Sequence, residues 1–143
     1  MVLTRQQLDR VRRSWAEAAP TGEALGAAFY SRLFQIAPYT RELFAGEVSG
    51  QQKKLVRTLD AVIDNLEQPD RLAAATRDLA ILHARRGVGA ADYTPVGDAL
   101  IWALGRQLGD RFDAETRDAW IAAYEMLSRE MIRAGREAAD RHG

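Results

Sequence analysis

The sequence predicts an all-α protein, and three observations support this fold class. Apolar residues recur every three or four positions through most of the 143 residues, which is the spacing of one face of an α-helix. No segment alternates apolar and polar residues for long enough to form a half-buried strand. Proline and glycine interrupt the helical pattern at intervals, so about six substantial helices and one short one are expected, packed as one domain.

Two helices are expected before residue 38. The first runs from about Thr4 to about Ala19, because Thr4 and Gln7 match a capping box and apolar residues follow at helical spacing. Proline and glycine within residues 20–22 end it, and Pro38 ends the second, since proline is tolerated only in a helix's first turn. The inner faces are expected to carry Leu8, Val11, Trp15, Ala18, Leu25, Phe29, Leu33 and Ile36.

Two more helices are expected between residues 49 and 86. Ser49 is expected to cap the first, with Gln52 at the capping-box position. Pro69 separates it from the second, which ends near His83 because cations and Gly87 follow. The inner faces are expected to carry Leu55, Leu59, Val62, Leu66, Leu72, Thr76, Leu79 and His83.

The last two helices begin near residues 94 and 113. Pro95 favours a helix start, Gly109 is expected to end that helix, and Asp113 is expected to cap the next one. Residues 135–143 are polar and are expected to fray as a tail of the domain, which spans residues 1–143. The inner faces are expected to carry Val96, Leu100, Leu104, Leu108, Trp120, Tyr124, Leu127 and Met131.

The composition excludes several functional classes. Lys+Arg and Asp+Glu number 20 each, so no net charge draws the protein to nucleic acid or to an anionic membrane. Cysteine is absent, which excludes disulfides, thiolate metal sites and thioether-linked haem. No signal peptide or membrane-spanning apolar run is present, so we expect a cytoplasmic protein.

His83 is the residue with the clearest functional signal. It is one of two histidines, the other being His142 near the C-terminus. His83 continues an apolar helix face and lies near the predicted end of that helix. An imidazole there either packs in the core or binds a ligand, and a neutral imidazole nitrogen is well suited to hold a metal.

Histidine phosphotransfer is one candidate function for this residue. The run His83-Ala84-Arg85-Arg86-Gly87 resembles the His-x-x-Lys-Gly pattern of phosphotransfer bundles, in which a cation near an exposed histidine attracts phosphoryl groups. Against it, His83 is predicted at a helix end and not in the middle of a bundle helix. The match also covers only five residues.

A second resemblance covers most of the chain. From about residue 8 to residue 131 the sequence resembles bacterial globins, most closely single-domain globins and the haem domains of flavohaemoglobins. The segments occur in the family's order and at spacings typical of it. They are Phe29-Tyr30-Ser31-Arg32-Leu33-Phe34, Pro38 through Leu43-Phe44, Gln51-Gln52-Lys53-Lys54-Leu55, Leu82-His83-Ala84-Arg85-Arg86-Gly87-Val88, Tyr93-Thr94-Pro95-Val96-Gly97, and Ala119-Trp120 with Tyr124.

The resemblance implies a globin fold of six to eight helices around non-covalently bound haem b. His83 corresponds to the proximal ligand of the haem iron, and Phe44 to the phenylalanine that packs against the porphyrin. Tyr30 and Gln51 correspond to the residues beside the open coordination site, with Leu55 nearby. A buried amide at Gln51 would be costly without a ligand to bond.

Other residues are implied as cofactor contacts. Lys54 and Arg86 are candidates to pair with the haem propionates, although long cations are also common on solvated faces. The remaining expected contacts are Leu55, Leu79, Leu82, Val88, Tyr93, Val96 and Leu127.

The chain departs from the flavohaemoglobin pattern on the proximal side. Tyr93 resembles the tyrosine beside the ligand histidine, but Gly135 stands where the relay glutamate is expected, and Glu137 follows two residues later. This departure puts peroxidase-like chemistry in doubt. The resemblance implies reversible binding of oxygen, carbon monoxide and nitric oxide, with oxygen transport or storage as the role. Nitric oxide dioxygenation with a separate reductase, or gas sensing, are the alternatives.

Overall fold

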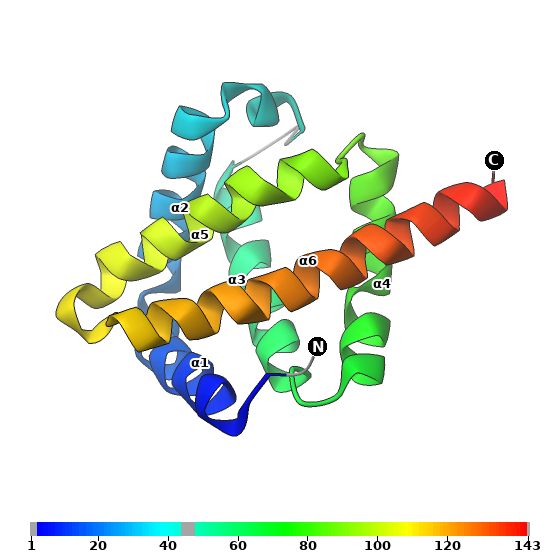
Figure 1. Ribbon diagram of the computed structural model, residues 1–143. Coiled ribbons are helices and arrows are strands. Elements are labelled where there is room, and N and C mark those ends of the chain that lie inside the picture. Colours follow the sequence, from blue (N-terminus) through cyan, green and yellow to red (C-terminus); the bar gives the residue numbers. More distant parts are fainter. Residues whose placement is uncertain (1–2, 44–47, 143) are drawn as a thin grey trace.

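The computed structural model describes residues 3–43 and 48–142, with side chains described for residues 3–42 and 53–140. The described residues form helices and no strand, which confirms the all-α prediction (Figure 1). The elements are α1 (Arg5–Ala18), η1 (Ala19–Thr21), α2 (Gly22–Ile36), η2 (Pro38–Leu43), α3 (Val48–Asp64), α4 (Pro69–Arg85), η3 (Ala90–Asp92), α5 (Tyr93–Leu108), η4 (Gly109–Arg111) and α6 (Ala114–His142), where η denotes a 3-10 turn.

Three predicted helix boundaries are confirmed by specific contacts. The Thr4 hydroxyl accepts a hydrogen bond from the Gln7 amide at 3.1 Å, and the Gln7 side chain accepts one from the Thr4 amide at 3.0 Å. Asp113 accepts a hydrogen bond from the Thr116 amide at 2.8 Å and so caps α6. Gly109 follows α5 with a φ of 58°, a left-handed conformation that glycine adopts without steric cost.

Two helix boundaries differ from the expected ones. The helix α3 begins at Val48, so Ser49 lies in its first turn and does not cap it. The polar residues from 135 onward belong to a helix, because α6 continues to His142. The reason lies in packing: Gly135 is buried, and a Cβ built on it would be 3.3 Å from the Ala84 Cβ of α4. Tertiary contact thus continues the helix through a polar stretch.

Helices α5 and α6 pack over the other four. The largest contacts are α2 with α5 and α4 with α6, followed by α1 with α6 and α2 with α3. Figure 1 shows the C-terminal half of α6 passing α4, far from the start of α6 beside α1. None of the helices within the described part of the chain is both long and apolar enough to span a bilayer.

Two tryptophans fix α1 against its neighbours. The rings of Trp15 and Trp120 meet edge to face with centroids 6.3 Å apart. The Trp120 indole donates to the buried Ser14 hydroxyl at 2.7 Å, and the Trp15 indole donates to Asp60 at 2.6 Å. Each buried ring nitrogen therefore has a partner, as an interior indole requires. These contacts hold α1, α3 and α6 together at one end and leave an interior space at the other.

Candidate functional site

A cavity of about 320 Å³ lies among α2, α3, α4, α5 and α6. Its volume is within the range of small-molecule and cofactor sites, about 300–1,000 Å³. Every predicted site residue whose side chain is described lines this one cavity. These residues are Tyr30, Lys54, Leu55, Leu79, Leu82, His83, Arg86, Val88, Tyr93, Val96 and Leu127.

Two predicted site residues cannot be placed in the cavity. Phe44 lies outside the described residues, and of Gln51 only the helical backbone in α3 is described. Their predicted roles therefore stay predictions. The sequence analysis also missed ten lining residues: Phe29, Thr40, Arg57, Thr58, Leu59, Asp92, Leu100, Tyr124, Ser128 and Met131.

His83 reaches the cavity from the last turn of α4. The helix ends at Arg85, and Gly87 turns the chain with a φ of 90°. The Val88 amide then donates to the His83 carbonyl oxygen at 2.9 Å, so the connection after α4 folds back onto the histidine. This backbone arrangement fixes the position of the His83 Cα atom, from which the imidazole extends.

One nitrogen of the His83 ring is buried without a hydrogen bond. Its Nδ1 atom is buried and has no hydrogen-bond partner among the described residues. Burial lowers the pKa of His83, and the nearby Arg86 cation lowers it further. The neutral imidazole is therefore favoured, which is the form that binds a metal ion.

Tyr30, on α2, also lines the cavity. Only 5% of its surface is exposed, and its ring packs edge to face on Phe29 with centroids 4.8 Å apart. Burial raises the pKa of Tyr30 to about 12. The phenol consequently stays protonated at physiological pH and can donate a hydrogen bond to a ligand in the cavity.

Two tyrosines form the part of the cavity wall next to His83. The Tyr93 ring lies with its centroid 6.3 Å from that of His83. The Tyr124 hydroxyl, on α6, donates to the Tyr93 carbonyl oxygen at 2.6 Å, which ties the start of α5 to α6. Burial raises the pKa of Tyr124, so it remains a donor.

Gly97 makes room for this contact. A Cβ built on Gly97 would lie 2.5 Å from Cε2 of Tyr124, closer than atoms can approach. We expect Gly97→Ala to push the Tyr124 ring away and to lower the free energy of unfolding by about 1–3 kcal/mol. Urea unfolding measures this change.

Gly105 provides a matched control on the same helix. Its Cβ would meet Phe112 at 3.4 Å, an ordinary contact. Gly105→Ala should therefore be neutral, or stabilise by up to about 1 kcal/mol through helix propensity. Equal destabilisation by the two substitutions would mean that Tyr124 does not limit Gly97.

Gly135 and Glu137, the described residues of α6 at and near the expected relay position, bring no carboxylate to His83. Gly135 has no side chain and packs on Ala84 and on the Ala80 carbonyl oxygen. Glu137 is exposed and pairs with Arg133 one turn earlier. Neither residue supplies an acceptor for the buried Nδ1, which has no hydrogen-bond partner among the described residues.

Three cations line the cavity. Lys54 and Arg57 come from α3 and Arg86 follows α4; all three are exposed at the lining. None of them forms an ion pair among the described residues, whereas arginines elsewhere do. They are free to pair with acidic groups of a bound molecule, and sequence analysis had not singled out Arg57.

The position of His83 disfavours phosphotransfer. A phosphoryl acceptor must present its imidazole to a partner's active site in solvent. His83 instead lines an interior cavity, with Nδ1 buried.

Comparison with known proteins identifies the fold family. The globin family profile matches residues 27–131. A flavohemoprotein of Rhizobium meliloti is 35% identical over 89% of this chain, and a globin-like protein of Aquifex aeolicus is 32% identical over 78% of both chains. An engineered carbene transferase, built on a candidate nitric oxide dioxygenase of Rhodothermus marinus, superposes with a TM-score of 0.88 at 29% identity over 97% of both chains.

The chain therefore belongs to the globin family. Family membership implies that it binds haem and small gaseous ligands. The chain spans about a third of the length of the flavohemoproteins that it matches (32% and 30%). Activities of those longer proteins are not carried over with the fold.

Proposed function

We propose that the cavity holds one haem b without covalent attachment, with His83 as the only protein ligand to the iron, and that the protein binds oxygen reversibly. The observation that carries this proposal is the imidazole of His83 on the wall of a mostly apolar cavity, where burial lowers its pKa and so favours the neutral form. The residues fit the cofactor: the cavity is mostly apolar, an imidazole lines it, and Lys54, Arg57 and Arg86 line it without an ion pair among the described residues.

Haem, when bound, supplies an iron centre with one position open to a diatomic gas. The chain's own residues would hold it and act on its ligand. His83 holds the iron, and the Val88 amide bond to its carbonyl fixes its backbone. Lys54, Arg57 and Arg86 pair with the two carboxylates of the cofactor.

Tyr30 is the proposed hydrogen-bond donor to the gas. Its ring is already packed against Phe29, so little conformational entropy is lost when it donates. Gln51 is the second proposed donor, from α3, and Phe44 the proposed aromatic contact to the ring plane. Leu55, Leu79 and Leu100 line the space with apolar surface and exclude water.

A second candidate is nitric oxide dioxygenation with a separate reductase. The relatives' names favour it, since one is a flavohemoprotein and another derives from a candidate nitric oxide dioxygenase. The orphaned Nδ1 of His83 weighs against it, because a carboxylate acceptor at that atom would increase electron donation from the ligand. Oxygen binding is therefore the primary proposal.

The test is an absorbance titration of the apoprotein with haemin, followed by reduction and exposure to oxygen. We expect one haem per chain and a spectrum that changes reversibly between oxygen and argon. Absence of a haem complex would overturn the proposal. Turnover of nitric oxide to nitrate at a rate set by added reductase would favour the second candidate.

A further inference from the structure

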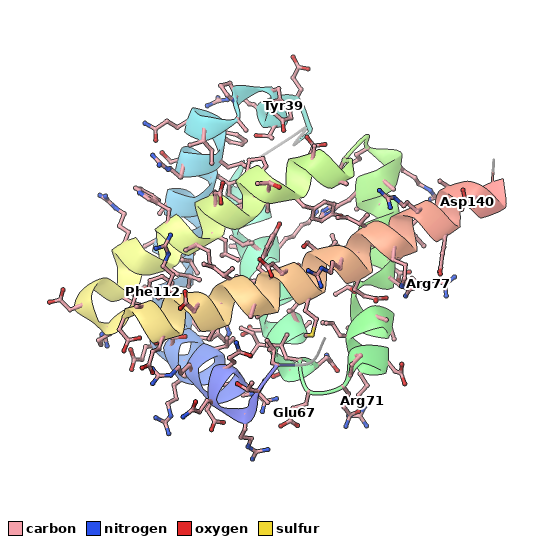
Figure 2. The ribbon with its side chains drawn as sticks, viewed as in Figure 1. Tyr39, Glu67, Arg71, Arg77, Phe112 and Asp140 are labelled. Carbon is pink, nitrogen blue, oxygen red and sulfur yellow. The ribbon has the colours of Figure 1, made fainter. Side chains whose placement is uncertain are left out.

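We propose that a hydrogen bond between Tyr39 and Asp92 latches two edges of the cavity together and slows loss of the bound cofactor. This inference rests on the proposed haem site. It concerns Tyr39 and Asp92, to which the sequence analysis assigned no role. Figure 2 labels Tyr39 on the turn that follows α2.

The latch joins two segments that are far apart in the sequence. The Tyr39 hydroxyl donates to Oδ1 of Asp92 at 2.7 Å, across 53 positions of the chain. The other carboxylate oxygen of Asp92 accepts the Gly89 amide at 2.8 Å. One carboxylate thus bonds the turn η2 on one side and the connection before α5 on the other.

Both segments form the cavity's wall. Thr40, next to Tyr39, lines the cavity and is 1% exposed, and its hydroxyl donates to the Ala37 carbonyl at 2.7 Å. This bond anchors η2 to the end of α2. Asp92 also lines the cavity, within a connection that contributes Arg86, Val88 and Tyr93 as well.

The latch therefore adds a third hydrogen-bonded anchor to the connection that follows His83, the proposed iron ligand. The connection starts at His83, whose carbonyl accepts the Val88 amide, and it ends at Tyr93, whose carbonyl accepts the Tyr124 hydroxyl. Its two ends are held by α4 and α6. Its middle, at Gly89 and Asp92, is held to η2 by Tyr39.

The chemistry suits a contact that breaks and reforms. A phenol donating to a carboxylate is a charge-assisted hydrogen bond. That bond raises the pKa of Tyr39, so the hydroxyl keeps its proton. Tyr39 is 53% exposed, and water competes for both partners. The latch should therefore modulate the escape of a bound molecule and contribute little to the fold.

The experiment measures transfer of haem from the loaded protein to excess apomyoglobin. Tyr39→Phe, which removes only the hydroxyl, should speed haem loss by about three- to tenfold, the factor expected for one net hydrogen bond. Asp92→Ala should speed it at least as much. In the double variant the effect should equal that of Asp92→Ala alone, because the Tyr39 hydroxyl then has no partner.

Controls separate the latch from general destabilisation. Asp78→Asn removes a charge from an exposed position of α4 that does not line the cavity, and should leave haem loss unchanged. The urea midpoint of the Tyr39→Phe apoprotein should equal that of the wild type. Unchanged haem loss in Tyr39→Phe, or effects that multiply in the double variant, would overturn the latch alone. A wild-type chain that takes up no haem would overturn the proposed function as well.

Discussion

His83→Ala is expected to remove tight haem binding. The substitution deletes the proposed single bond between the protein and the iron, and the apolar walls alone cannot hold the metal in place. A cofactor that binds only the folded state also stabilises that state, so the variant should unfold at a lower temperature when haem is present. Absorbance during purification and thermal unfolding monitored by circular dichroism measure both effects.

Added imidazole should restore part of the haem binding in His83→Ala. The truncated side chain leaves space on the cavity wall where a free imidazole can take the place of the ring. His142→Ala, which alters the chain's other histidine, should behave as the wild type. Full haem retention with an unchanged ferrous spectrum in His83→Ala would remove His83 from the proposed role.

Tyr30→Phe is expected to have the largest effect on oxygen retention. A hydrogen bond from a preorganised phenol should stabilise bound oxygen by about 1.4 kcal/mol or more. Its removal should therefore speed oxygen release roughly tenfold or more. Because burial raises the pKa of Tyr30 to about 12, the phenol stays protonated and remains a donor at pH values well below that. The wild-type release rate, measured by stopped flow, should therefore be nearly constant between about pH 6 and 10.

Gln51→Leu should have the smaller effect. An amide on a flexible stem loses rotamer entropy of order 1 kcal/mol when it orders, whereas the Tyr30 ring is already packed. Carbon monoxide release should respond weakly to both substitutions, since carbon monoxide accepts hydrogen bonds less well. If Gln51→Leu speeds oxygen release more than Tyr30→Phe does, the amide is the main donor and the proposed ordering is wrong.

Helices and their ends were predictable where the signal is local. The capping box of Thr4 and Gln7 and the cap by Asp113 each involve residues three apart, so the sequence contains the whole interaction. The start of α3 and the continuation of α6 were not predictable in this way. The latter depends on Gly135 meeting Ala84 of α4, and periodicity does not show which helices touch.

The candidate site was predictable through its helical stripes and the family resemblance. Phe29, Leu59 and Leu100 were expected on inner faces, but periodicity does not distinguish a cavity wall from a filled core. Ile36 was also expected inside and is 39% exposed, because coverage of a helix's last turn depends on its neighbours.

Contacts between polar residues far apart in sequence gave no signal at all. Tyr39 and Asp92 meet only because η2 and the connection before α5 come together in the fold. From the sequence, Arg57 could not be distinguished from any cation on a solvated helix face. The structure shows that it lines the same cavity as Lys54. These are the residues for which the three-dimensional arrangement added most.

The most direct test of the central claim is a crystal structure of the haem-loaded protein. The account predicts iron bonded to Nε2 of His83, the porphyrin in the cavity that Leu55, Leu79 and Val96 line, and the Tyr30 hydroxyl on the opposite side of the ring. Iron bonded to another residue, or haem bound outside this cavity, would contradict it.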